Sequence, residues 1–334
     1  MKKSYYLFNP GELSRKDNTL KFVAVDADGV SQQPRYLPVE SIEELYVFGA
    51  LEANSALYNF LGREQISVHF FDYHENYTGS FMPREALLSG KVLMAQARWH
   101  DNKKKRLALA ALILDGAAYN MIKNLKYYDK RGKELDGLID QMEQLSKSLF
   151  LAKDIQELMG YEGNIRRVYY EAFDLIINNF NMDGRSMRPP QNEVNALISF
   201  GNMMCYSQCL RAIHLTQLNP VISFLHSPGE RRFSLSLDLA EIFKPILVDR
   251  VIFKVLNKKM IQAKDFEQSL NRVVLKDGAK KVFVQAFEER LNETIMHRDL
   301  ERSVSYKHLI KLECYKIVKH ILDIEPYKPF KIWW

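Results

Sequence analysis

The stretch LLSGKVLMAQA, residues 87–97, marks the point where the pattern of the chain changes. From here on, apolar residues recur at spacings of three and four, as Leu88, Val92 and Ala95 do, which is the period of a helix with one buried face. Before it, apolar and polar residues alternate over short runs, which is the period of a strand. The pattern predicts an α+β protein in which a small N-terminal β domain precedes a larger, all-α C-terminal domain.

Residues 1–80 form the expected β domain. Turn residues such as Asn9-Pro10-Gly11 separate its alternating runs, and one short helix is expected at Ser55 to Leu61. The expected strands include Ser4 to Phe8, Leu20 to Val25 and Ile66 to Phe71.

Residues 81–334 form the expected helical domain, and turn-forming residues divide it into about eight helices. One buried helix should have Pro189 and Pro190 in its first turn and run to Leu218, because proline is tolerated at that position. The expected breaks fall near Asp129–Gly132, Gly160, Asp183–Pro190, Asn219–Arg232 and Lys276–Gly278.

The charge of the chain is divided unevenly. The net charge is +6, but residues 1–80 hold 7 Lys+Arg and 11 Asp+Glu, so they carry −4 and the remainder carries +10. The helical part is therefore the expected binder of a polyanion such as DNA, although such an excess can also be a solvated face.

Two further features of the sequence limit the kinds of protein that this chain can be. The longest apolar run, Leu107 to Leu114, is far shorter than the roughly 20 residues of a membrane span. The chain also starts without the apolar core of a signal peptide, so we expect no membrane association and a cytoplasmic protein. Cys205, Cys209 and Cys314 match neither a disulfide framework nor a zinc site, which predicts buried free thiols.

The stretch Ser223 to Pro245 places a loop histidine, His226, before an acid-bearing helix. Ser234 is the expected N-cap of that helix, and Asp238 and Glu241 lie three residues apart and so on one face. Two carboxylates on an apolar helix are costly to bury unless a cation lies beside them. That cation is either a metal ion or a basic side chain such as Lys244 or Arg231 in an ordinary ion pair.

Glu162 is a third acid of interest, because Gly160 and Gly163 flank it at an expected helix start. Small neighbours allow a ligand to approach closely. Arg166 lies four residues further on the same face, so the alternative is a local Glu-Arg pair worth about 0.2–0.5 kcal/mol. One imidazole with two or three carboxylates is a ligand set suited to Mg²⁺ or Mn²⁺, which serve phosphate chemistry.

These segments together resemble the CRISPR-associated endonuclease that acts as the integrase of the adaptation module. The Gly-x-Glu-Gly motif of that family matches Gly160–Gly163, its Leu-His loop matches Leu225-His226, and its acidic helix matches Ser234–Pro245. Ser223 stands where the family often has glycine, and Arg231-Arg232 stands where Gly-Arg is frequent. The β part resembles the family's first domain at Gly11–Arg15, Asn18–Leu20, Leu37–Val39 and Phe70–Asp72, and residues 306–334 resemble the type I-B branch.

The resemblance implies a role for each site residue. Glu162, His226 and Glu241 would be the metal ligands, and Asp238 would support the site or bind a second ion. Basic residues would contact the DNA backbone, or be plain surface; the candidates are Lys244, Arg166, Arg231, Arg232 and the Lys103–Arg106 run.

The resemblance also implies a reaction and partners. A homodimer formed through residues 1–80 would join CRISPR-associated protein two and insert a short double-stranded DNA into a repeat array by transesterification. The same site with water as nucleophile would act as an endonuclease. Two alternatives stay open, namely a metal-dependent nuclease that works alone and a non-catalytic helical scaffold that binds DNA or protein.

Overall fold

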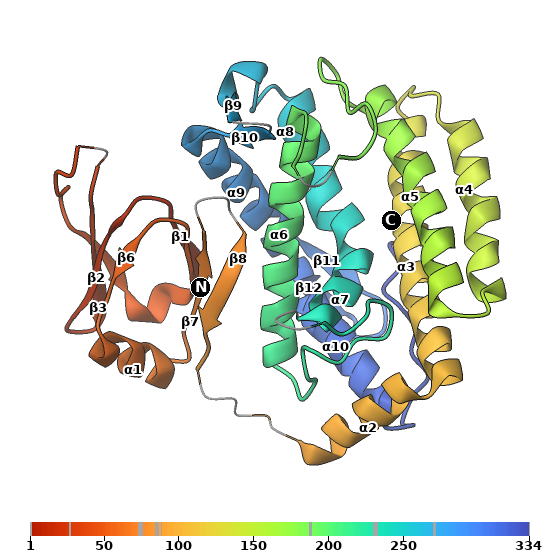
Figure 1. Ribbon diagram of the computed structural model, residues 1–334, viewed down its shortest axis with the longest axis horizontal. Helices are drawn as coiled ribbons and strands as arrows, with labels where there is room; N and C mark the ends of the chain where they lie inside the picture. The colour runs from red at the N-terminus through yellow and green to blue at the C-terminus, as the bar shows by residue number, and fades with distance from the viewer. Residues whose placement is uncertain are drawn as a thin grey trace. The chain divides into compact units, whose positions relative to one another are not determined.

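The computed structural model describes residues 2–26, 28–72, 76–83, 87, 89–186, 189–229, 233–269 and 272–333. The chain forms two compact units, Met1–Ala86 and Leu87–Trp334 (Figure 1). Strand β8 (Tyr77–Phe81) pairs with β7 (Ser67–Phe71), so the first unit extends beyond residue 80, where the sequence pattern set the boundary. The combination of sheets and helices confirms the α+β class.

Among its described residues, the first unit contains two four-stranded sheets and one α-helix. One sheet has the order β1-β5-β7-β8, in which β5 is parallel to both neighbours, and the other has the order β4-β3-β2-β6. The helix α1 (Ser55–Arg63) begins after Asn54, whose side chain accepts a hydrogen bond from Leu57 N at 3.0 Å. The remaining strands are β1 (Lys3–Leu7), β2 (Gly11–Lys16), β3 (Thr19–Ala24), β4 (Arg35–Pro38), β5 (Ile42–Val47) and β6 (Leu51–Glu52), and a short 3₁₀ turn covers Val39–Ser41.

The core of this unit follows from the alternation along its strands. Successive side chains of a strand point to opposite faces, so every second residue is buried against the other elements. Leu20 and Phe22 of β3, Leu45 of β5 and Leu61 of α1 are buried in this core. The predicted strands and the predicted helix are confirmed. They could be predicted because turn residues mark the ends of each periodic run.

The second unit is mainly helical, but the prediction that it is all-α is wrong. Two antiparallel hairpins interrupt the helices, and their four-residue strands are too short to show a period in the sequence. These strands are β9 (Phe266–Ser269), β10 (Arg272–Leu275), β11 (Thr294–His297) and β12 (Arg302–Ser305). The helices are α2 (Gly90–Asp101), α3 (Lys103–Asp129), α4 (Asp136–Ser148), α5 (Ile155–Ile176), α6 (Glu193–His214), α7 (Ser234–Lys244), α8 (Arg250–Asn257), α9 (Asp277–Asn292) and α10 (Tyr306–Ile321), with 3₁₀ turns at Leu149–Leu151 and Ala263–Asp265.

The helix α5 continues through the break that was predicted at Gly160. It starts after Asp154, whose carboxylate accepts a hydrogen bond from Glu157 N at 2.8 Å. A glycine inside a helix costs only about 1 kcal/mol relative to alanine, and the packing of α5 on α3 and α4 outweighs this cost. Glu162 therefore lies about two turns inside a helix and not at its start.

The helix α6 begins and ends inside its predicted bounds. Asn192 is its N-cap and accepts a hydrogen bond from Asn195 N at 2.9 Å, so Pro189 and Pro190 precede the helix instead of forming its first turn. The helix ends at His214 and not at Leu218. An asparagine cap sets the start because its side chain satisfies a free backbone N–H, which proline cannot do.

The helix α7 is held between α3 and α6 (Figure 1). Pro245 has no N–H to donate, and the backbone after α7 widens into a π-helical turn, Pro245–Asp249. From α3, Asn120 Nδ2 donates to Ile242 O at 3.1 Å and Asn124 Nδ2 donates to Pro245 O at 2.6 Å. These two bonds fix the position of α7 along α3.

Gly116 of α3 packs closely against Pro329 in the C-terminal segment. A Cβ at this position would lie 2.6 Å from Pro329 Cβ, so the helix and the segment are packed too closely for a larger residue. We expect Gly116→Ala to lower the free energy of unfolding by about 1–3 kcal/mol in urea titrations. Gly137→Ala in α4 is the matched control, because nothing lies within 4 Å of a Cβ there, and it should stabilise by up to about 1 kcal/mol. Equal effects of the two changes would show that the segment does not pack here.

The three cysteines and the charged surface were also open to prediction. Cys205, Cys209 and Cys314 are free and buried, which confirms the prediction for the thiols. Within the described ranges, no helix has the length and apolar character needed to cross a membrane.

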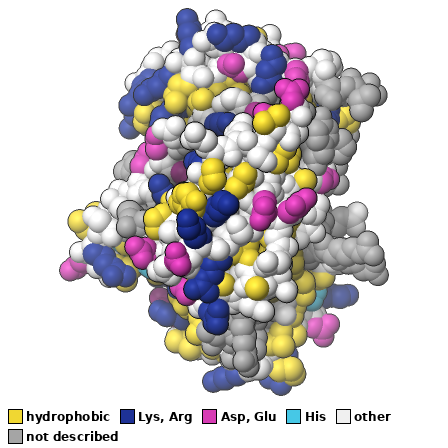
Figure 2. All heavy atoms as spheres, turned by 90° about the vertical axis from the view of Figure 1, so that its left-hand side faces the viewer, with side chains coloured by type: hydrophobic (Ala, Val, Ile, Leu, Met, Phe, Trp, Pro, Cys, Tyr) yellow, Lys and Arg dark blue, Asp and Glu magenta, His cyan; other side chains and the backbone are white. Residues whose placement is uncertain are grey.

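On the face drawn in Figure 2, Lys and Arg side chains stand among acidic and apolar ones, so this face carries both signs of charge.

Candidate functional site

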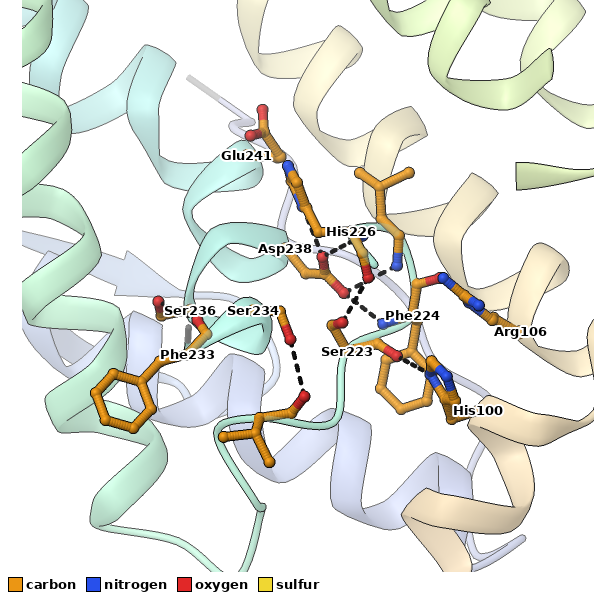
Figure 3. A network of polar contacts seen from close by, with 12 residues as sticks. His100, Arg106, Ser223, Phe224, His226, Phe233, Ser234, Ser236, Asp238 and Glu241 are labelled. Carbon is orange, nitrogen blue, oxygen red and sulfur yellow. Dashed lines mark hydrogen bonds and ion pairs between the residues drawn. The ribbon is translucent and has the colours of Figure 1, made fainter. Parts of the chain in front are cut away.

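The helix α7 begins with Phe233 at its N-cap position, and the predicted cap by Ser234 is wrong. The Ser234 hydroxyl donates to Val221 O at 2.8 Å, so it ties the start of α7 to the preceding loop (Figure 3). The Ser236 hydroxyl donates to Phe233 O at 2.7 Å. Arg231 and Arg232, predicted to contact DNA, lie outside the described residues.

Asp238 organises the loop that carries His226. Its carboxylate is fully buried and accepts from four donors: Phe224 N at 2.6 Å, Leu225 N at 3.0 Å, His226 N at 3.0 Å and His226 Nδ1 at 2.8 Å (Figure 3). Each of the two oxygens receives two of these bonds. Asp238 is therefore a positioning residue for His226.

A second set of contacts holds the same loop from α2 and α3. His100 Nδ1 lies 2.5 Å from Ser223 O, and Arg106 Nε donates to Phe224 O at 2.8 Å (Figure 3). The Ser223 hydroxyl, which stands where glycine was expected, donates to His226 O at 2.6 Å. Arg106, predicted as a DNA contact within the Lys103–Arg106 run, is thus engaged in the loop, whereas Lys103 and Lys104 are exposed.

The imidazole of His226 is oriented by these bonds. Because Asp238 is an acceptor, Nδ1 carries the proton, and in the neutral ring Nε2 has a lone pair for a ligand. Figure 3 shows the ring extending along α7 from Asp238 toward Glu241. The side chain of His226 is 18% exposed, so a small ligand can reach it from solvent.

Glu162 and Glu241 come from different helices and meet at one guanidinium. Arg166 of α5 forms ion pairs with Glu162 on its own helix and with Glu241 of α7. The other oxygen of Glu241 receives a bond from Lys244 Nζ at 2.7 Å. Both basic residues, predicted to contact DNA, are thus engaged with carboxylates in the structure.

The comparisons with known proteins agree on one family. Residues 5–289 match the family model described as CRISPR associated protein Cas1. A relative from Fusobacterium nucleatum, named CRISPR-associated endonuclease Cas1, is 44% identical over 335 residues, covering 100% of this chain and 98% of the relative. The chain belongs to the Cas1 family.

Several solved structures share the fold of this chain. The Cas1 protein of Thermotoga maritima superimposes with a TM-score of 0.85 at 36% identity, covering 98% of this chain and 100% of that one. A casposase bound to its integration product gives a TM-score of 0.86 at 19% identity, over 98% and 93% of the two chains. A Cas6-RT-Cas1–Cas2 complex gives 0.80 at 18% identity, over 99% of this chain and 36% of that chain. The last two show a common fold.

Whether a divalent metal ion suits this Cas1 site depends on the donor groups that the site contains. Within the part of the chain that the structure describes, no three His, Cys, Asp or Glu side chains are grouped closely enough to hold an ion as they stand. In this arrangement Arg166 forms ion pairs with both glutamates. The donor types nevertheless fit Mg²⁺ or Mn²⁺, because Glu162 and Glu241 are carboxylates that share Arg166, and His226 offers an oriented imidazole nitrogen.

The electrostatics of this Cas1 site follow from burial and charge. Burial lowers the pKa of Arg166, but the interactions with Glu162, Tyr170 and Tyr206 together outweigh burial, so the pKa lies above its usual value and the guanidinium stays charged. Burial also raises the pKa of Asp249, at the end of the π-helical turn, to about 7. Asp249 accepts a hydrogen bond from Tyr169 OH at 3.0 Å, and Asn124 Nδ2 donates to that hydroxyl at 3.0 Å. This triad was not predicted from the sequence, because its members come from three separate helical segments.

Proposed function

We propose that this Cas1 protein cuts and joins DNA at a divalent metal ion held by Glu162, His226 and Glu241, and inserts short DNA duplexes into a CRISPR repeat array. The single observation that carries the proposal is the meeting of α5, α7 and the 223–226 loop. Glu162 and Glu241 share the Arg166 guanidinium. Asp238, which lies one helical turn before Glu241 on α7, binds His226. Membership of the Cas1 family and the name endonuclease of its relatives support the reaction class.

The residues of the site would divide the work of transesterification. A bound Mg²⁺ or Mn²⁺ would polarise the phosphodiester and lower the charge cost at the attacking and leaving oxygens. Glu162 and Glu241 would supply anionic oxygens and His226 its Nε2, while Asp238 keeps the imidazole in the required tautomer. Lys244, buried beside Glu241, would set the direction of that carboxylate and add positive charge near the phosphate.

The partners proposed are DNA, a second copy of this chain and CRISPR-associated protein two. The casposase that shares the fold is bound to an integration product, and another structure with this fold is a complex that contains Cas2. We propose that the unit Met1–Ala86 mediates dimerisation and that the helical unit binds double-stranded DNA, in keeping with the charge division of the sequence. The binding of DNA should then weaken steeply with salt, as counterion release requires.

Removal of the metal tests the proposal. The purified chain is incubated with a labelled DNA duplex and a plasmid that carries a repeat, with and without the Cas2 partner. We expect EDTA to abolish joined products and Mn²⁺ or Mg²⁺ in excess to restore them. Cut products without joined ones, whether or not Cas2 is added, would favour a stand-alone nuclease. Binding of DNA with neither product would favour a scaffold.

A further inference from the structure

Arg166 is more deeply buried than a residue in an ordinary surface ion pair. Its side chain is 16% exposed, and it pairs with Glu162, which is 20% exposed, and with Glu241, which is 5% exposed. The partner on α5 is a local one, four residues away, but the partner on α7 comes from a separate helix. Arg166 therefore joins two of the three proposed ligands.

The charges explain why the site tolerates this arrangement. Two carboxylates that face each other in a partly buried place repel, and leaving them unpaired is costly. Arg166 and Lys244 balance the charge of Glu162 and Glu241, so the four groups are neutral together. A divalent ion bound by the same carboxylate oxygens cannot coexist with the guanidinium in its present place, because both require those oxygens.

The Arg166 guanidinium also reaches a neutral group on its own helix. Arg166 Nη1 lies 3.5 Å from the hydroxyl of Tyr170, which is one turn further along α5 and only half buried. A rotation of the side chain toward Tyr170 would keep the charge at the edge of the site. With Arg166 released and a metal ion bound, the site would be positively charged and would attract an anionic phosphodiester.

We propose that Arg166 is a resident counter-cation, which holds Glu162 and Glu241 together until a divalent metal ion displaces it and then contacts the phosphate of bound DNA. This inference rests on the proposed function, because it takes the metal to bind Glu162 and Glu241. It makes Arg166 a residue that couples occupation of the metal site to recognition of the nucleic acid. The coupling is reciprocal, so DNA should in turn strengthen the binding of metal.

The test measures Mn²⁺ binding without DNA, by electron paramagnetic resonance or calorimetry on the full chain. Arg166→Ala and Arg166→Gln should each bind Mn²⁺ about 10-fold more tightly than the unchanged protein, in the range of ordinary coupling between sites. Arg166→Gln is included because it keeps a hydrogen-bond donor for Glu162 if the alanine variant does not fold. Arg167→Ala is the matched control, since Arg167 lies on the same helix in an exposed ion pair with Glu171 and should leave the affinity unchanged.

A second measurement separates displacement from simple loss of charge. Fluorescence anisotropy of a labelled duplex, read before turnover, should show that Mn²⁺ strengthens DNA binding to the unchanged protein. This gain should be at least several-fold smaller in Arg166→Gln, although that variant binds Mn²⁺ more tightly. An equal or weaker Mn²⁺ affinity in both Arg166 variants would overturn the inference, as would an undiminished gain in DNA affinity.

One further variant distinguishes this failure from a failure of the proposed function. Glu162→Gln should lose Mn²⁺ binding if Glu162 is a ligand. If Glu162→Gln binds Mn²⁺ as the unchanged protein does, the ligand assignment itself is wrong. If Glu162→Gln loses binding while the Arg166 variants gain none, the metal site stands and only the role of Arg166 is rejected.

Discussion

Glu162→Gln, His226→Ala and Glu241→Gln should each lower the rate of strand transfer at least about 100-fold, because each removes one ligand of a metal ion that stabilises the charge of the transition state. The three residues come from α5, the 223–226 loop and α7, so a common effect would show that these segments act together. Glutamine keeps the shape of glutamate and removes the anionic charge. The measurement is the yield of joined DNA under single-turnover conditions with Mn²⁺.

The control for these changes is Glu171→Gln. Glu171 lies on α5 like Glu162, but its side chain is 47% exposed and pairs with Arg167 at the surface. It should leave the rate of strand transfer and the melting temperature nearly unchanged, since exposed ion pairs contribute about 0–1 kcal/mol. Full strand transfer by any one of the three site variants would remove that residue from the ligand set.

Asp238 carries the second large prediction. Asp238→Ala would leave three backbone N–H groups and the His226 Nδ1–H without their buried acceptor, so we expect a loss of at least about 3 kcal/mol in the free energy of unfolding. Asp238→Asn keeps the volume but places an amide donor against donors. In that variant we expect the affinity for Mn²⁺ to fall about 10- to 100-fold, as for other residues that orient a metal-binding histidine.

The control for Asp238 is Asp115→Asn on α3. The carboxylate of Asp115 is 25% exposed and pairs with Lys331 at 2.6 Å, so its loss should cost no more than about 1 kcal/mol and leave metal binding intact. Asp238→Asn with unchanged Mn²⁺ affinity would contradict the positioning role. It would indicate that Ser223, His100 and Arg106 are sufficient to hold the loop.

The parts of the fold that the sequence predicts are those with a clear period and a chemical boundary. The strand at Leu20 to Val25 and the helix at Ser55 to Leu61 have both, and the structure contains them. Gly160 led to a wrong boundary, because a glycine weakens a helix by an amount that tertiary packing readily outweighs. The cap predicted at Ser234 failed for another reason, since its hydroxyl found a partner in Val221 O, 13 residues away in the preceding loop.

In the candidate site, too, the features set by local spacing could be predicted, and those set by helix packing could not. The spacing of Asp238 and Glu241 placed both acids on one face of a helix, but it could not show that they have different partners, the loop of His226 for one and Arg166 with Lys244 for the other. The ion pair between Glu162 and Arg166 was predicted, as the alternative to a metal ligand, from its spacing of four residues, and the structure contains it. The contact of Arg166 with Glu241 depends on how α5 and α7 pack, and no local pattern in the sequence encodes it.

The most direct test of the metal site is anomalous diffraction from a crystal of this protein soaked in Mn²⁺. We predict one strong peak about 2 Å from a carboxylate oxygen of Glu162, from one of Glu241 and from Nε2 of His226, with the Arg166 guanidinium moved away from both glutamates. A crystal that shows manganese bound elsewhere, or these three side chains unchanged around Arg166 at saturating Mn²⁺, would contradict the proposed site.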